Sequence, residues 1–195
     1  MRVSKEKAAE NRARILAEAA RLFRERGLSG VGVDALTEAA GLTHGSLYSQ
    51  FGSKDRLTAE ALAHALAHGR LTRPPEAAEA GPEGPLAAIV GRYLSPSHRD
   101  APGQGCALAA VGCEIPRHGP AVRRIFTEGL RTRMDRLAAL LPGRRRAARE
   151  DQALSILATL VGALILARAV DDPELSDRIL TASAAHLTDS TEPQQ

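Results

Sequence analysis

Aromatic residues are scarce in this chain of 195 residues: they make up 3% of it, and Trp is absent. The chain therefore has few of the residues that favour β-strands, whereas Ala, Leu and Arg, which favour helices, recur throughout. This composition predicts an all-α fold. The length allows one large domain or two small ones, and either size buries enough surface for a stable core.

Cysteines and long apolar runs are also scarce. The chain has two cysteines, which we expect to be free thiols rather than a disulfide framework. The longest apolar segment, 153–167, contains Ser155 and Thr159 and stops at Arg168, so a buried helix is favoured over a membrane span. The first twenty residues are charged and lack an apolar core with a cleavage site. We therefore expect a cytoplasmic protein without a secretory signal.

The common catalytic and nucleotide-binding motifs are absent. The sequence has no Gly-x-x-x-x-Gly-Lys-(Ser/Thr) loop, no Gly-x-Gly-x-x-Gly after a strand, no His-Glu-x-x-His and no clear nucleophile elbow. We therefore expect neither enzymatic activity nor a cofactor. His64 and His68 share one helical face and could hold a metal, but no third ligand lies at a telling spacing. A polar helix face explains them more economically, so no metal site is expected.

Positive charge is concentrated in the N-terminal part of the chain, although the formal net charge is only +3. Residues 1–73 contain 12 Lys and Arg against 8 Asp and Glu, whereas the remainder contains 14 against 15. A polyanionic partner is expected to bind where positive charge is in excess. The N-terminal third is therefore the candidate region for nucleic acid.

Apolar residues at helical spacing predict four helices in the first 70 residues. The second and third are about two turns long and are joined by a tight glycine turn, which makes a helix-turn-helix. Glycines end the first three helices, and Ser53 caps the fourth. The expected helices are 5–26 ending at Gly27, 33–40 ending at Gly41, a helix with Leu47 and Phe51 ending at Gly52, and a helix from Ser53 to about Gly69.

Helical patterns resume after residues 72–85, which carry four prolines and two glycines and are expected to form a loop. The polar tail 188–195 is expected to be flexible. These patterns divide the chain into a head over 1–52, with the start of a connecting helix over 53–70, and a body over 71–187. The helices expected in the body lie near 86–94, 105–115, 121–141, 150–170 and 173–187.

The stretch from Val33 to Leu57 carries the most informative motif. It reads VDALTEAAGLTHGSLYSQFGSKDRL: a short helix ending in Ala-Gly, then Gly-Ser-Leu-Tyr, then Phe-Gly-Ser-Lys-Asp-Arg-Leu, without a gap. This pattern resembles the DNA-binding signature of the TetR/AcrR family of transcriptional regulators. The resemblance implies a homeodomain-like three-helix head and a helical body that binds a ligand and dimerises. It also implies a repressor that leaves its palindromic operator when a small molecule binds.

Physical reasoning also indicates that the short helix around Leu47 binds DNA. A helix rich in small polar residues can enter a major groove while its bulky residues face the core. Gly45 would let the backbone approach DNA closely. By the resemblance, Tyr48 donates a hydrogen bond to a phosphate, and Lys54 should add an ionic phosphate contact. A purely structural helical hairpin is the alternative. The candidate DNA-binding residues are Gly32, Val33, Thr43, His44, Gly45, Ser46, Tyr48, Ser49 and Lys54, and Gln50 is also free to meet DNA.

Two of these positions depart from the family pattern. His44 stands where many relatives carry Lys, and a neutral imidazole attracts phosphate less strongly. Gly32 stands where many relatives carry a hydroxyl cap, so a backbone amide would have to supply that phosphate contact. Both changes are expected to weaken DNA binding without changing its mode.

Cys106, Cys113 and Arg168 are candidates for redox or electrophile sensing. Cys106 begins a predicted helix, whose dipole favours the reactive thiolate. The sequence Gly-Cys-Ala-Leu, followed by the Glu114–Ile115 pair, resembles TetR relatives that derepress when a cysteine is modified. In such relatives a basic residue near the position of Arg168 lies close to that cysteine. In one continuous helix the Cα atoms of the two cysteines would lie about 10 Å apart, too far for a disulfide. The alternatives are a small core residue at Cys106 and a favourable helix-end charge at Arg168.

The last two long helices, 150–170 and 173–187, are rich in Ala, Leu and Ile. In the family such helices pair across a two-fold axis into a four-helix bundle, so we expect a homodimer. The expected partners are a double-stranded DNA operator and a small-molecule effector, with no membrane partner. An activator or a global DNA binder of the same fold remains an alternative function. The basic run Arg144–Arg146 with Arg149 could also bind nucleic acid, but a solvated loop explains it more economically.

Overall fold

The structure, a computed structural model, describes residues 5–69, 81–82, 84–143 and 145–189. These residues form helices joined by turns, and none of the described residues belongs to a strand, which confirms the all-α prediction. Contacts divide the chain into two compact units. We call Met1–His68 with Cys106–Gly129 the head unit, and Gly69–Gly105 with Leu130–Gln195 the body unit.

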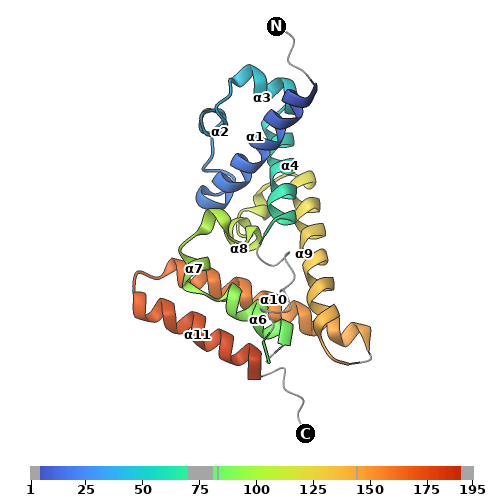
Figure 1. Ribbon diagram of the computed structural model, residues 1–195, viewed down its shortest axis with the longest axis vertical. Coiled ribbons are helices and arrows are strands. Elements are labelled where there is room, and N and C mark those ends of the chain that lie inside the picture. The colour runs from blue at the N-terminus through green and yellow to red at the C-terminus, as the bar shows by residue number, and fades with distance from the viewer. Residues whose placement is uncertain (1–4, 70–80, 83, 144, 190–195) are drawn as a thin grey trace. The chain divides into compact units, whose positions relative to one another are not determined.

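The head unit is built around its first helix (Figure 1). This helix, α1, packs against α2, against α4 and against the short helix α8 from later in the chain. Its apolar face carries Ile15, Ala19 and Phe23, all of which are buried. The helices of the unit are α1 (Lys5–Arg26), α2 (Val33–Ala40), α3 (His44–Phe51), α4 (Lys54–Ala67), α8 (Ala107–Val111), η3 (Ile115–Arg117) and the first part of α9 (Pro120–Leu140).

The body unit is centred on two long C-terminal helices that lie side by side (Figure 1). Of these two, α11 also contacts the shorter helix α6 (Gly84–Tyr93), and α10 contacts the single-turn helix α7 (Pro96–Arg99). The elements are α6 (Gly84–Tyr93), α7 (Pro96–Arg99), η2 (Pro102–Gln104), the second part of α9, α10 (Arg146–Ala169) and α11 (Pro173–Asp189).

The predicted continuous helix over 105–115 is wrong. The helix α8 covers only Ala107–Val111, residues 112–114 form a turn, and η3 follows. Pro116 contributes to the break, because it has no N–H to donate to the carbonyl of the preceding turn. Cys113 therefore lies in a turn beyond α8, and the separation expected for two cysteines of one helix does not apply.

Smaller differences occur at other helix ends. α10 begins a turn before residue 150, where the Arg146 Nε lies 2.6 Å from the Glu150 Oε1 in an i,i+4 pair that supports its first turn. α11 continues to Asp189, so the first two residues of the expected tail are helical. The single turns α7 and η2 were not expected. Most of the predicted loop 72–85, residue 144 of the basic run and the tail beyond 189 lie outside the described residues.

The expected division into 1–52, 53–70 and 71–187 stays a prediction about domains. The compact units add one fact to it: residues 106–129 group with the N-terminal helices rather than with the rest of the body. Both candidate cysteines consequently belong to the head unit. This grouping matters for the sensing hypothesis, because α8 in the cysteine-bearing segment packs against α1 and α4, which in turn contact the predicted DNA-binding helices α2 and α3.

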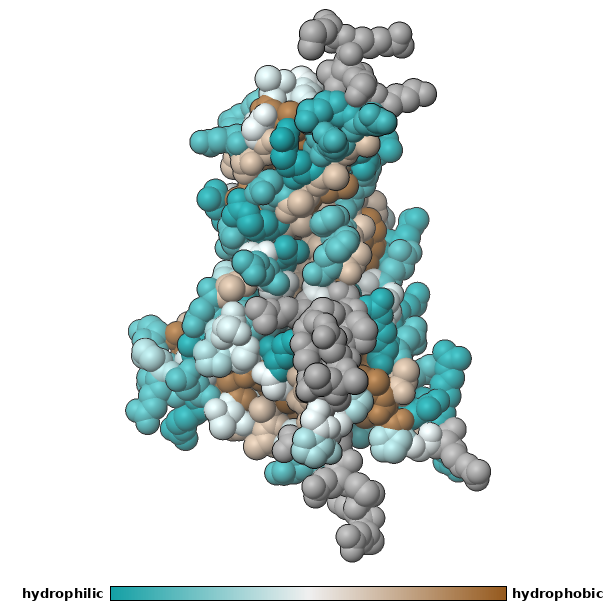
Figure 2. Space-filling model, viewed as in Figure 1, coloured by the Kyte–Doolittle hydropathy of each residue, from teal (hydrophilic) through white to brown (hydrophobic). Residues whose placement is uncertain are grey.

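Among the helices of the described residues, one, α10, is long and apolar enough to cross a membrane by length and composition alone. Seven of its residues are buried, and it packs along α11, as a core helix does. The face seen in Figure 2 is mostly hydrophilic, with apolar residues in small separate patches. These observations support a core helix in this position.

Candidate nucleic-acid interface and sensing residues

Local sequence encodes the helix-turn-helix of α2 and α3. Gly41 ends α2 with a φ of 62°, a left-handed conformation that favours glycine, and its N–H donates to the carbonyl of Glu38. Thr43 caps α3, because its side chain accepts a hydrogen bond from the Ser46 N–H at 3.3 Å. Ser53 caps α4 in the same way, by accepting from the Arg56 N–H at 3.1 Å. The predicted helix ends in this motif are confirmed.

The helix α3 has one face in the core and one in solvent. Leu47 and Phe51 are 0% and 1% exposed, so they anchor the helix against the rest of the head unit. The Tyr48 side chain is 47% exposed, which is unusual for a large aromatic residue. Of the predicted DNA-binding residues, Gly32, Thr43, His44, Gly45, Tyr48 and Ser49 are exposed, whereas Val33, Ser46 and Lys54 are half-buried.

Two glycines on this surface have no role in internal packing. A Cβ added at Gly45 would meet only the Thr43 Oγ1, at 4.0 Å, and one added at Gly32 would meet no described atom within 4 Å. Both have negative φ values, so left-handed backbone does not require glycine at either place. A close external partner would explain their lack of a side chain. The geometry is therefore compatible with backbone approaching DNA at these two positions.

Several polar side chains of the motif contact one another. The Ser49 hydroxyl donates to the Ser46 carbonyl at 2.9 Å, and the Gln50 amide donates to the Ser46 hydroxyl at 3.1 Å. The His44 Nε2 lies 2.5 Å from the Asp34 Oδ1, which links the first turns of α3 and α2. Sequence reasoning did not foresee the His44–Asp34 contact, which directs the imidazole toward a carboxylate.

Arg12 is a further residue that sequence reasoning missed. Its guanidinium lies 4.7 Å from the centre of the Phe51 ring and forms an ion pair with Glu60. The side chain thus connects α1 to the end of α3 and to α4. In the sequence it was one of several arginines on the polar side of the first helix, and no signal marked it as different.

Lys54 lies in the first turn of α4, beside the cap of that helix. We expect Lys54→Ala to weaken binding about equally on operator and on unrelated DNA, because a phosphate contact reads no base. In a dimer that loses one such contact per subunit, the slope of log K against log salt should become shallower by about 2. Salt titrations of DNA binding by fluorescence anisotropy would measure this. An unchanged slope, or a loss confined to the operator, would contradict the assignment of Lys54 to phosphate.

Cys106 is buried, with 1% of its surface exposed, whereas Cys113 is exposed. Cys106 stands directly before α8, which at five residues is too short to supply the helix dipole expected from sequence. A positive charge is supplied by Arg24 instead. Burial lowers the pKa of the Arg24 guanidinium, and electrostatic interactions with Cys106 and Glu25 oppose that shift. The Cys106 thiol therefore lies within electrostatic range of a half-buried arginine.

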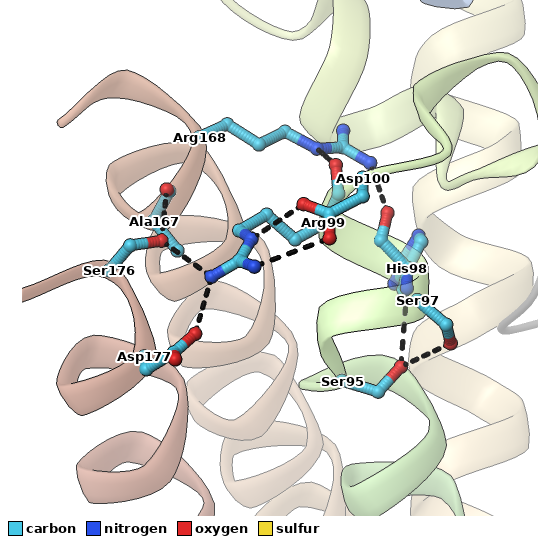
Figure 3. Close-up of polar contacts among 9 residues, drawn as sticks. All are labelled: Ser95, Ser97, His98, Arg99, Asp100, Ala167, Arg168, Ser176 and Asp177. Atoms are coloured by element: carbon cyan, nitrogen blue, oxygen red, sulfur yellow. Dashed lines mark hydrogen bonds and ion pairs between the residues drawn. The ribbon is translucent and has the colours of Figure 1, made fainter. Parts of the chain in front are cut away.

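Arg168 braces two segments of the body unit (Figure 3). Its Nε donates to the Arg99 carbonyl at 3.0 Å, and its Nη2 donates to the His98 carbonyl at 2.6 Å. Both carbonyls lie at the C-terminal end of α7. Arg168 therefore stabilises the end of α7 as well as carrying a charge at the end of α10. A Cβ at Gly105 would lie 3.0 Å from the Arg168 Nη2 and 2.9 Å from the His98 Nε2, so glycine is needed there. The assignment of Arg168 to sensing stays a prediction.

Arg99 extends this brace to α11 (Figure 3). Its Nη1 donates to the Ser176 hydroxyl at 2.9 Å and to the Asp177 Oδ1 at 2.5 Å, and its Nε donates to the Asp100 Oδ1 at 2.7 Å. Asp100 and Asp177 raise the pKa of the Arg99 guanidinium above its usual range. Sequence reasoning missed Arg99, because its partners in α11 are 77 and 78 residues away.

Each unit also has an open cleft. The body-unit cleft has a volume of about 330 Å³ and includes Arg99, Arg168 and Pro173 in its lining. The head-unit cleft has a volume of about 640 Å³ and is lined by the loop after α1 and the first turns of α4 and α9. Volumes of this order accommodate small ligands.

Comparison with known proteins agrees with the fold and with the motif. Residues 15–61 match the family model described as bacterial regulatory proteins, tetR family. The chain is similar to the reduced form of Escherichia coli NemR, with 22% identity, a TM-score of 0.77, and coverage of 95% of this chain and 100% of that one. No curated protein sequence matches the chain significantly.

Two further solved structures show the same likeness. A TetR-family transcriptional regulator from Cytophaga hutchinsonii has 24% identity and a TM-score of 0.75, with both chains covered completely. A TetR regulator from Chloroflexus aurantiacus has 25% identity and a TM-score of 0.69, with coverage of 97% of this chain and 98% of that one. Residues 15–61 thus match the tetR family of bacterial regulatory proteins, and over nearly its whole length the chain shares the fold of these TetR-family transcriptional regulators.

Proposed function

We propose that this protein is a transcriptional repressor of the TetR family that binds a palindromic operator as a homodimer and releases it when an effector or a thiol modification reaches the protein. The observation that carries the DNA-binding part is the solvent face of α3. It presents Gly45 and Tyr48, while Leu47 and Phe51 anchor the opposite face in the core. Such a face can enter a major groove without disturbing the packing of the head unit.

The homodimer is supported by apolar residues that α10 and α11 leave uncovered. Leu166 is 57% exposed, and Leu154 and Leu175 are each 41% exposed. Large aliphatic residues at this exposure on two adjacent helices are typical of a face that a second copy covers. Two heads held by such a bundle would reach successive major grooves, about 34–36 Å apart on B-DNA.

Cys106 is the thiol through which we propose that modification acts. It precedes α8, which packs against α1 and α4, and its side chain has almost no exposed surface. A group attached to this sulfur would not fit unless α8 moved away from the DNA-binding helices. The Arg24 guanidinium lies within electrostatic range of this thiol. Cys113 is accessible in the folded protein and would react sooner, but its exposed position offers no packing to disturb.

The test uses N-ethylmaleimide, whose activated carbon bonds to the thiolate sulfur while the adjacent carbon takes up a proton. We expect the reagent to lower operator affinity about tenfold or more in the wild-type protein and in Cys113→Ser, but not in Cys106→Ser. Mass spectrometry would record which cysteine carries the adduct. Equal loss in all three proteins would contradict the role of Cys106. Tight operator binding without any loss would leave the repressor but assign release to a non-covalent effector.

Two other functions give different results. A global DNA binder would protect scattered sites without sequence preference, whereas a local repressor protects a palindrome that overlaps a promoter. An activator would raise transcription from that promoter when bound. Enzymatic activity would require the purified protein to convert a candidate ligand, which we do not expect.

A further inference from the structure

The side chain of Glu114 holds the loop that connects α1 to α2. Its Oε1 accepts a hydrogen bond from the Leu28 N–H and its Oε2 accepts one from the Ser29 N–H, each at 3.0 Å. Glu114 is the last residue of the turn after α8 and lies 86 residues from Leu28 in the chain. One carboxylate thus serves two backbone donors of a distant segment, and both contacts lie within the head unit.

Gly27 makes room for this carboxylate. A Cβ at Gly27 would lie 2.3 Å from the Glu114 Oε1, closer than any real Cβ contact. Gly27 also has a φ of 77°, which glycine adopts without strain. The same glycine therefore ends α1 and leaves the space in which Glu114 reaches the next two amides.

We propose that Glu114 is a positioning residue that fixes the loop before α2, and that it transmits displacement of α8 to the DNA-binding helices. The loop leads within a few residues to Gly32, the cap of α2. Hydrogen bonds from backbone amides to a carboxylate are stronger than those to a neutral acceptor, so this one side chain can define the loop position. The transmission part, that Glu114 passes a displacement of α8 on to the DNA-binding helices, rests on the proposed function. The holding part, that Glu114 fixes the loop before α2, rests on geometry alone.

The chain between the buried thiol and this carboxylate is short. Cys106 precedes α8, and Glu114 follows it, with its N–H donating to the Val111 carbonyl at 2.9 Å. The helix contacts both α1 and α4. A displacement of α8 would consequently move Glu114, draw its carboxylate away from Leu28 and Ser29, and free the loop that leads to α2.

The holding part is tested by amide hydrogen exchange of the full chain, read at Leu28 and Ser29 in Glu114→Gln. The neutral amide has one acceptor oxygen instead of two, so we expect at least one of these amides to exchange about tenfold faster. Glu128→Gln is the matched control, because Glu128 is exposed on α9 and the change in charge is the same. Exchange at Leu28 and Ser29 that is equal in the two variants would overturn the proposal.

Glu114→Asp provides a second variant if the first unfolds. It keeps the charge but shortens the side chain by one methylene, so we expect faster exchange at the same two amides. Thermal unfolding of each variant would show whether the effect is local. Fast exchange confined to Leu28 and Ser29 supports the holding role, whereas faster exchange spread evenly over α1 and α4 contradicts it.

The transmission part is tested by operator affinity with and without N-ethylmaleimide. We expect Glu114→Gln to lower the unmodified affinity about fivefold and to shrink the further loss on modification, because the connection is already weakened. A full additional loss in Glu114→Gln, equal to that of the wild type, would overturn transmission through this residue. If the wild type itself shows no loss, the proposed thiol function fails, but the exchange result at Leu28 and Ser29 still decides the holding role.

Discussion

Gly45→Leu is expected to lower specific DNA binding strongly while leaving the protein folded. The added side chain would project from the first turn of α3 into solvent, where the nearest internal atom to a Cβ is the Thr43 Oγ1 at 4.0 Å. Leucine also stabilises a helix relative to glycine by about 0.5–1 kcal/mol. The substitution therefore separates the cost to DNA binding from any cost to the fold.

The expected loss of operator affinity is about 100-fold, because each of two half-sites would lose a contact worth roughly 1–3 kcal/mol. The bulky side chain would keep the backbone of α3 from approaching the groove. Fluorescence anisotropy on the selected operator would measure the dissociation constant, and circular dichroism would confirm the fold. Gly91→Leu is the matched control: Gly91 is exposed on α6, and an added Cβ would meet no described atom within 4 Å.

The result that would count against the interface is a Gly45→Leu protein that binds the operator as tightly as Gly91→Leu. An additional measurement addresses the mode of binding. If α3 lies in the major groove, methylation protection of guanine N7 atoms by the wild-type protein should disappear in Gly45→Leu and persist in Gly91→Leu.

Arg168→Met should destabilise the body unit by about 2–4 kcal/mol, because two hydrogen bonds from a charged donor are lost and two carbonyl acceptors remain. Those acceptors are the carbonyls of His98 and Arg99 (Figure 3). Methionine preserves most of the length of the side chain, so lost packing contributes little. Urea or thermal unfolding at one fixed protein concentration would measure the change, since the stability of a dimer depends on concentration.

Arg131→Met is the control for this prediction. Arg131 is exposed on the part of α9 that belongs to the body unit, and its replacement removes the same charge. We expect it to change the free energy of unfolding by less than about 0.5 kcal/mol. Equal stability of the two variants would show that the contacts of Arg168 with α7 contribute nothing, and its proposed sensing role would then be its remaining explanation.

The helix-turn-helix could be predicted from the sequence because each of its boundaries is encoded locally. Gly41 and Gly52 have positive φ values at the ends of their helices, and Thr43 and Ser53 cap the helices that follow. The apolar residues between them recur at helical spacing. Local signals of this kind need no knowledge of distant segments.

The region around Cys106 could not be predicted in the same way. The sequence of this region predicts one helix. The structure instead has a short helix followed by turns, with Pro116 beyond the helix and a long-range contact between Glu114 and the loop after α1. A carboxylate that binds amides 85 and 86 residues away leaves no local pattern. The same holds for Arg99 and Arg168, whose partners belong to distant helices and depend on tertiary packing.

The central claim is that α3 of each subunit reads one half of a palindrome, and selection of bound sequences from a random DNA pool tests it most directly. We expect enrichment of one inverted repeat whose half-sites are centred about 10 base pairs, or a multiple of that, apart. Footprinting should show protection of both halves by the wild type and of neither by Gly45→Leu. A pool that stays random, or an enriched sequence without two-fold symmetry, would contradict the account.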